Sequence, residues 1–193
     1  MILNAEPIGA GHPLLGKIET LALEAFPPEE YLAPDRMIEM SQREQLEIWV
    51  LKDGDMFVGF TVIKLYRKLA YLFFLAVEPA LRSRGYGKRA VETMIAKYPD
   101  RIHTVDFEMP DESAENNAQR LRRRNFYLSC GYRETGVFLS YLGVDYEVLG
   151  MGKRFDETMF AEMMRSITID CFEPRFFKKT SRPVHGNTPA DTV

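Results

Sequence analysis

The chain has 193 residues, of which 46% are hydrophobic and 27% are charged, and its formal net charge is −3. This composition is ordinary for a soluble protein with one domain and a short appendage. The chain has no apolar run near the ~20 residues of a membrane span and no signal-peptide pattern at its N-terminus. We therefore expect a cytoplasmic protein with no membrane partner, and the acidic charge argues against binding nucleic acid.

The two cysteines, Cys130 and Cys171, are too few for a disulfide framework in a chain of this length. Neither cysteine has companions at the spacing of metal ligands. We therefore expect two reduced thiols and no metal site.

Apolar periodicity predicts the elements in chain order. We expect helices over 12–26 and 34–43, strands over 46–51, 56–66 and 71–77, a helix after Gly87, a strand over 102–108, a helix over 114–129, strands over 132–142 and 144–150, and a helix over 156–168. The run 71–77 is apolar throughout, which is typical of a central strand buried on both faces.

The strand, helix and strand across 71–108 imply a parallel crossover, whereas the hairpins on either side imply antiparallel neighbours. The expected class is therefore α+β (α/β in a looser usage), with a mixed sheet. We expect one domain over residues 1–152, a C-terminal helical extension over 153–173 and a flexible polar tail over 174–193.

A glycine loop, Arg82-Ser83-Arg84-Gly85-Tyr86-Gly87, joins the central strand to the next helix. Backbone N–H groups and the helix dipole at such a junction favour an anion, and glycines let the backbone approach it closely. Arg82, Arg84 and Lys88 add positive charge that suits phosphates. The P-loop, dinucleotide and kinase patterns do not match. The loop alone leaves open an anion site or a glycine-rich helix entry with incidental arginines.

The surroundings of the loop carry a family resemblance. The stretch Leu75 to Lys88, LAVEPALRSRGYGK, resembles the acetyl-CoA signature of the GNAT superfamily of N-acetyltransferases, and Phe126 to Tyr132, FYLSCGY, resembles its second block. The order of elements agrees over roughly residues 1–152. The stretch Asn117 to Tyr132 looks like a bacterial subgroup of small GNAT proteins whose substrates are generally unassigned.

The resemblance implies a GNAT-like mixed sheet and an N-acetyltransferase that uses acetyl-CoA as co-substrate. The pyrophosphate would lie on backbone N–H groups of the loop, and the pantetheine arm would run along 71–77 like an added strand. The N–H of Leu75 would polarise the acetyl carbonyl, and Val77 would pair with pantetheine, aimed by a strand bulge. The implied cofactor-binding residues are Leu75, Ala76, Val77, Arg82, Ser83, Arg84, Gly85, Tyr86, Gly87, Lys88 and Arg120.

The resemblance also implies catalytic roles. Tyr127 matches the tyrosine that gives a proton to the leaving CoA thiolate, and helical spacing puts it on one face with Arg120 and either Arg123 or Arg124. Some members carry a glutamate base on the central strand, where this chain has Tyr71. Glu108, at the end of the next strand, is therefore our candidate base. Glu112 and Glu115 are weaker candidates. Arg120 replaces an asparagine common in the family and is expected to contact CoA phosphate or nothing.

The expected reaction is direct transfer to a primary amine, of a small molecule or a peptide, in a ternary complex. The acidic stretch Asp106 to Glu115 favours a cationic amine. One alternative is a catalytically degenerate module that binds CoA as a sensor or regulator, supported only by the missing glutamate at position 71. Another is an interaction protein whose methionine-rich helix over 156–168 docks a partner or a second copy, which would make a homodimer.

Overall fold

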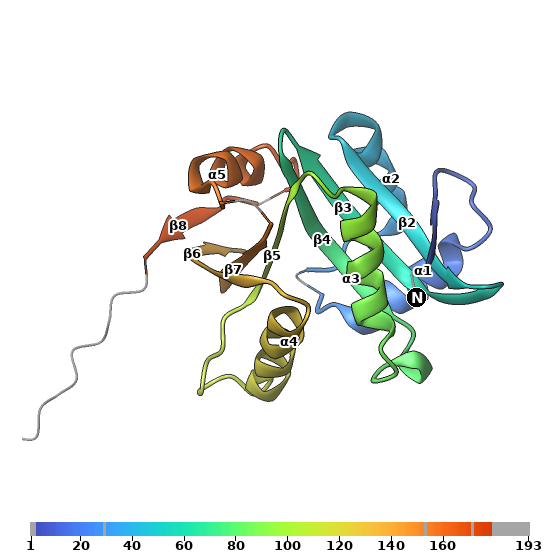
Figure 1. The fold of residues 1–193 in the computed structure, drawn as a ribbon. Coiled ribbons are helices and arrows are strands. Elements are labelled where there is room, and N and C mark those ends of the chain that lie inside the picture. The colour runs from blue at the N-terminus through green and yellow to red at the C-terminus, as the bar shows by residue number, and fades with distance from the viewer. Residues whose placement is uncertain (1–2, 29, 153, 171, 179–193) are drawn as a thin grey trace, which may run out of the picture.

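The computed structural model describes residues 3–178, apart from residues 29, 153 and 171. Its core is an 8-stranded sheet in the order β1-β2-β3-β4-β5-β7-β6-β8 (Figure 1). The strands are β1 (Asn4–Pro7), β2 (Leu46–Asp53), β3 (Met56–Tyr66), β4 (Leu69–Val77), β5 (Ile102–Glu108), β6 (Arg133–Tyr141), β7 (Val144–Met151) and β8 (Arg175–Phe177). The helices are α1 (Leu15–Ala25), α2 (Pro34–Arg43), α3 (Tyr86–Lys97), α4 (Asn117–Ser129) and α5 (Glu157–Arg165), and a 3-10 turn, η1, covers Pro79–Leu81.

The expected α+β class and mixed sheet are confirmed, since β4 and β5 are parallel and the other neighbouring strands are antiparallel. Periodicity did not predict β1, η1 or β8, because each is too short to carry a clear repeat. Among the described residues, no helix combines the length and the apolar character needed to cross a bilayer.

Strand β8 corrects the expected start of the flexible tail at residue 174. Residues Arg175–Phe177 pair with the outer edge of β6, and Phe177 stacks on Phe138 with ring centroids 5.9 Å apart. The composition of this segment is polar, but pairing with an open strand edge and one apolar contact across it order these residues as a strand. Residues 179–193 of the predicted tail and Cys171 lie outside the described residues.

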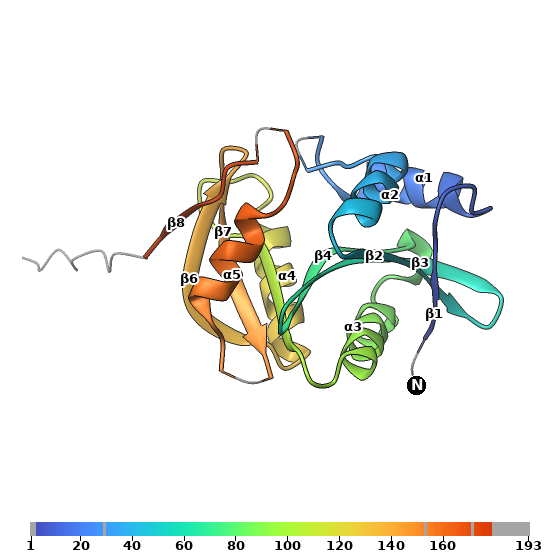
Figure 2. The same cartoon turned by 90° about the horizontal axis from the view of Figure 1, so that it is seen from above.

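Helices cover both faces of the sheet. Helices α1 and α2 pack on one face and α3 lies on the other (Figure 2). Two apolar clusters follow this division. One unites α1, α2 and α5 with β4, β6 and β7, and the other unites α3 and α4 with β4 and β5. The sheet is therefore the middle layer of the fold, and both faces of its central strands are buried.

The methionine-rich helix α5 belongs to this core. Phe160, Met163 and Met164 have no exposed surface, and the Phe160 ring lies 6.0 Å from that of Tyr71 on the central strand. This apolar face packs on the chain's own sheet, which removes the reason for expecting it to dock a partner. The homodimer stays a prediction with no support from this helix.

Strands β4 and β5 lie side by side for only a short distance. Their parallel pairing ends where Tyr71 is opposite Thr104. Beyond that point β5 continues to pair with β7 on its other edge, while β4 stays with β3, so the sheet opens into a fork (Figure 1). A break in the β3–β4 register leaves Phe73 as an extra residue of β4 within the fork. Such a bulge bends the strand and turns its edge.

Gly59 on β3 supports the strand that forms one arm of the fork. A Cβ atom placed there would lie 2.0 Å from the carbonyl oxygen of Ala76 on β4. We expect Gly59→Ala to lower the free energy of unfolding by about 3 kcal/mol, because neither backbone can move without breaking the ladder. Urea denaturation measures this. Gly16→Ala, where a Cβ meets nothing within 4 Å, is the control and should cost nothing. Equal stabilities of the two variants would contradict the close approach.

Candidate active site

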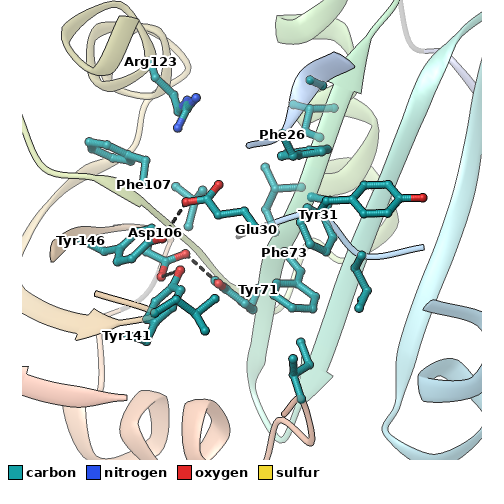
Figure 3. A pocket seen from close by; sticks show the side chains of 18 of the residues that line it. Phe26, Glu30, Tyr31, Tyr71, Phe73, Asp106, Phe107, Arg123, Tyr141 and Tyr146 are labelled. Atoms are coloured by element: carbon teal, nitrogen blue, oxygen red, sulfur yellow. Dashed lines mark hydrogen bonds between the residues drawn. The ribbon is translucent and has the colours of Figure 1, made fainter. Parts of the chain in front are cut away.

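The fork between β4 and β5 holds a cavity of about 160 Å³. Its walls come from the α1–α2 connection, β4, β5, α4, the turn between β6 and β7, and the segment after α5 (Figure 3). The described residues that line it are Ala25, Phe26, Glu30, Tyr31, Leu32, Tyr71, Leu72, Phe73, Phe74, Leu75, Val105, Asp106, Phe107, Arg123, Tyr127, Tyr141, Leu142, Tyr146, Ile169 and Phe172. The cavity thus spans the sheet and meets both helical layers.

Part of the backbone of β4 points toward the fork instead of pairing with β3. The N–H of Glu78 donates to the carbonyl of Val58 on β3. In an antiparallel pair, residues alternate between pairing with the neighbour and pointing away from it. Given the register, Leu75 and Val77 therefore turn their N–H and C=O groups away from β3 and toward the fork. These are the two residues that the sequence assigned to the acyl donor.

The glycine loop follows directly from this arm of the fork. Gly85 is the N-cap of α3 with φ 82°, and Ser83 has φ 60°, so both adopt the left-handed conformation that turns the chain sharply into the helix. No side chain caps α3, so the N–H groups of its first turn are left for another acceptor. A Cβ at Gly87 would lie 3.2 Å from the Phe126 ring, so this glycine lets α3 approach α4. The predicted anion site therefore has the backbone form expected of one.

The charged side chains of the loop divide into two groups. Arg84 and Lys88 are exposed beside it. Arg82 bends back, donating from Nε to the carbonyl of Val77 at 3.0 Å and pairing with Glu24 at 3.3 Å. The Tyr86 hydroxyl donates to Asp53 at 3.0 Å, which ties the start of α3 to the β2–β3 turn.

Tyr127 enters the cavity from α4. Its ring stacks on Phe107 at 5.9 Å, and its side chain is almost fully buried. Burial raises the pKa of its hydroxyl well above the ordinary value, and the positive charge of Arg123 opposes that rise. A tyrosine in this state keeps its proton at neutral pH, which a proton donor requires.

The cavity contains a carboxylate that we did not single out from the sequence. Asp106 on β5 accepts hydrogen bonds from the hydroxyls of Tyr71 at 2.6 Å and Tyr141 at 2.9 Å (Figure 3). Burial raises the pKa of Asp106 to about 6, although the two hydroxyls favour its charged form. Tyr71 stands where some members of the resembled family carry a glutamate base on the central strand. Here its hydroxyl binds a carboxylate that comes from β5.

A second carboxylate lies beside the first. Glu30, from the α1–α2 connection, accepts a hydrogen bond from the Tyr146 hydroxyl at 2.6 Å. The rings of Tyr141 and Tyr146 stack with centroids 3.9 Å apart. These stacked tyrosines thus hold one carboxylate each, and the charge of Glu30 contributes to the raised pKa of Asp106.

Glu108 and Arg120, two residues predicted for the site, pair with each other instead of facing the cavity. Arg120 binds Glu108 at 3.0 Å and also donates to the carbonyl of Met109 and the side chain of Asn116. Arg123 lies 3.4 Å from the other oxygen of Glu108. Neither Glu108 nor Arg120 is among the described residues that line the cavity. This geometry supports neither the proton-accepting role nor the phosphate contact.

The cavity residues that we did not predict differ in whether the sequence could have revealed them. Asp106 stands between Val105 and Phe107 in an apolar strand, and a carboxylate buried in such a strand needs hydrogen-bonding partners. The sequence contained that signal, but we chose Glu108, two residues further along the same strand, as the candidate base. Glu30, Tyr141 and Tyr146 had none, because nothing in their local pattern connects them to β5.

Comparison with known proteins agrees with this architecture. Residues 15–132 match the model of the acetyltransferase (GNAT) family, and the chain therefore belongs to that family. A search of curated proteins found no match.

Solved structures give the same fold. A protein from Bacteroides thetaiotaomicron assigned to the GNAT family is 26% identical and superposes with a TM-score of 0.65, covering 84% of this chain and 93% of that one. An acetyltransferase from Bacillus subtilis in complex with CoA is 17% identical, with a TM-score of 0.54 over 78% of this chain and 99% of that one. A GNAT acetyltransferase from Elizabethkingia anophelis with acetyl-CoA bound is 15% identical, with a TM-score of 0.54 over 78% and 98%.

The raised pKa of Asp106 predicts how stability depends on pH. Between its unfolded pKa of about 3.9 and its folded pKa of about 6, the folded chain keeps a proton that the unfolded chain releases. We therefore expect the stability of the natural chain, relative to Asp106→Asn, to be highest below pH 4 and to fall as the pH rises to about 6. Urea denaturation of both proteins across this range measures the difference. A difference that is flat or rises with pH would contradict a raised pKa.

Proposed function

We propose that this protein transfers an acetyl group from acetyl-CoA to a primary amine, by direct attack within a ternary complex. The observation that carries the proposal is the fork itself. Leu75 and the buried Tyr127 line its cavity, and Val77 and the glycine loop follow Leu75 on the same arm of the fork. That two of the similar structures contain CoA or acetyl-CoA supports the choice of donor.

In this proposal the chain binds the donor mainly through its backbone. The N–H groups at the start of α3 receive the pyrophosphate, with Arg84 and Lys88 adding charge. The outward edge of β4 pairs with the amide groups of the pantetheine arm. The N–H of Leu75 then lies where the acetyl oxygen gains negative charge, and it stabilises the tetrahedral intermediate.

The chemical step breaks the thioester C–S bond and forms a C–N bond. The amine nitrogen attacks the acetyl carbon, and the sulfur leaves as the electron pair of the C–S bond moves onto it. Tyr127 gives its hydroxyl proton to that sulfur, so the products are an amide and the free thiol. A proton lost by the nitrogen replaces the one that Tyr127 gave away.

The CoA-binding sensor remains the alternative, and one experiment separates the two. Calorimetry with acetyl-CoA measures binding, and thiol release with a panel of amines measures turnover. The transferase requires both. Binding without turnover on any amine would favour the sensor, and the absence of acetyl-CoA binding would refute both functions.

The first variant tests the loop. We expect Gly85→Asp to weaken acetyl-CoA binding about 100-fold, because it places a negative charge and a strained residue at the anion site and so removes charge-assisted hydrogen bonds. Calorimetry measures the loss. Gly136→Asp is the matched control, because Gly136 also has a positive φ of 74° and open space around it. Similar losses in both variants would mean that the effect is not local to the loop.

The second variant tests the proton donor. We expect Tyr127→Phe to slow turnover on the order of 100-fold, the scale of general-acid catalysis, while acetyl-CoA affinity stays within about twofold. Thiol release under saturating substrate, together with calorimetry, measures both effects. Tyr132→Phe is the control, since that buried tyrosine packs beside Tyr127 with ring centroids 5.7 Å apart and is not among the described residues that line the cavity. Unchanged turnover in Tyr127→Phe would refute the acid role.

A further inference from the structure

The acceptor side of the cavity has a charge pattern suited to one cation. The described charged residues that line the cavity are Glu30, Asp106 and Arg123. Arg123 lies 3.4 Å from Glu108, but that carboxylate also pairs with Arg120 at 3.0 Å, so the two arginines keep one positive charge between them. The two cavity carboxylates are held side by side by the stacked Tyr141 and Tyr146. The two negative charges and the positive charge of Arg123 leave a formal net charge of −1 among the described lining residues, which a single ammonium group would neutralise.

The carboxylate of Asp106 keeps acceptor capacity for a ligand. Tyr71 and Tyr141 each bind a different oxygen of Asp106, and a carboxylate can accept about four hydrogen bonds in all. The hydroxyls that fix the Asp106 carboxylate come from β4 and β6, so its position does not depend on a mobile side chain. An ammonium group beside it would donate to the remaining lone pairs.

The opposite wall is aromatic. Phe26 lies against Phe74 with ring centroids 4.8 Å apart, and Phe73 lies 4.5 Å from Phe74. Figure 3 shows Phe26 and Phe73 across the cavity from Asp106 and Tyr146. Phe172, from the segment after α5, covers Tyr141 at 4.8 Å. A carboxylate placed among these rings would lose its hydration without gaining a partner.

The volume of the cavity limits the size of the acceptor, which has to fit beside the acetyl group of the donor. About 160 Å³ is close to the ~150 Å³ of an apolar cavity that holds one benzene molecule. An aminoglycoside or a long polyamine would extend well beyond such a space. The cavity therefore suits one ring or a short branched chain attached to one amino group.

We propose that the acceptor is a small primary amine with one positive charge and an aromatic or branched apolar body, and that the carboxylate of Asp106 receives its nitrogen. This inference rests on the proposed acetyl transfer. Asp106 binds the ammonium, takes one of its protons and so frees the electron pair that attacks the acetyl carbon. The groups that surround this carboxylate are Glu30, Tyr71, Tyr141 and Tyr146, with Arg123 across the cavity. A folded pKa of about 6 leaves Asp106 mostly ionised at neutral pH, as a proton acceptor must be.

An amine panel tests the acceptor class. We expect kcat/KM for 2-phenylethylamine and 3-methylbutylamine to exceed that for spermidine, kanamycin, phenylalanine and an alanyl peptide by about tenfold or more, because only the first two satisfy both walls. Equal or better turnover of any of the other four would overturn this inference and leave the transferase intact. Binding of acetyl-CoA without acetylation of either apolar amine would also overturn it. Failure to bind acetyl-CoA would instead refute the proposed function.

Variants of Asp106 test the proton transfer. We expect Asp106→Asn to lower kcat/KM for 2-phenylethylamine about 100-fold at pH 7, with acetyl-CoA affinity unchanged. The difference in kcat/KM between the variant and the natural protein should be smaller near pH 10, because the amine then binds without its extra proton. Asp145→Asn, at an exposed carboxylate on β7, is the control and should change neither value. Glu108→Gln separates this assignment from the earlier candidate, since a larger loss there than in Asp106→Asn would overturn it.

A variant of the aromatic wall tests the body of the acceptor. We expect Phe26→Ala to raise KM for 2-phenylethylamine about tenfold and to leave KM for methylamine within about twofold, since only the larger amine reaches the rings. Phe26→Leu provides the same comparison with a smaller change in the core. Phe138→Ala removes a ring that stacks on Phe177 and is not among the described lining residues. The same rise for both amines, or an equal rise in Phe138→Ala, would overturn the aromatic contact.

Discussion

The short parallel contact between β4 and β5 is the constraint on which the rest of the site depends. The two strands pair as far as Tyr71 and Thr104 and then separate, because each remains bound to an antiparallel neighbour on its other edge. A sheet that closed fully would use the backbone groups of Leu75 and Val77 internally. The fork leaves them outside the ladder, where the carbonyl of Val77 accepts a hydrogen bond from Arg82 and the N–H groups need another partner. In the proposed function that partner is the acyl donor, so one break in the sheet accounts for both the space and the groups that bind.

The same break explains why a carboxylate can come from β5. Tyr71 is the last β4 residue before the strands separate, and Asp106 follows the end of the pairing on the opposite arm. A hydroxyl on one arm can therefore reach a carboxylate on the other, at 2.6 Å. Burial of this charge is tolerated because two hydroxyls donate to it. The cavity thus contains an acidic group on β5, although the central strand carries Tyr71 instead of a glutamate.

The C-terminal segment gives the acceptor half of the cavity its enclosure. Helix α5 packs in the same apolar cluster as α1 and α2, which fixes the start of the segment that follows it. Ile169 and Phe172 then line the cavity, and β8 closes the open edge of β6. Residues outside the matched range 15–132 therefore build part of the wall that we assign to the acceptor. Substrate choice in this proposal depends on parts of the chain that the family pattern does not include.

The sequence by itself determined the order of the elements and the form of the glycine loop. The helix and strand order was predictable because each element carries its own period, and α2, β3 and β5 begin and end where the pattern placed them. The glycine loop was predictable for a related reason. Its form depends on backbone groups and glycines that are contiguous in the chain, so their arrangement needs no distant partner.

Only the tertiary structure decided which carboxylates and tyrosines meet in the cavity. Glu30, Asp106 and Tyr141 are far apart in sequence, and the fold brings them together through the α1–α2 connection, β5 and β6. Local spacing did not distinguish Asp106 from Glu108, since both lie on the same strand. The two residues differ in their neighbours, which spacing in the sequence does not reveal. Arginines of α4 pair with Glu108, whereas tyrosines of β4 and β6 donate hydrogen bonds to Asp106. The role of a side chain whose partners come from other elements is set by packing, and a local pattern does not contain it.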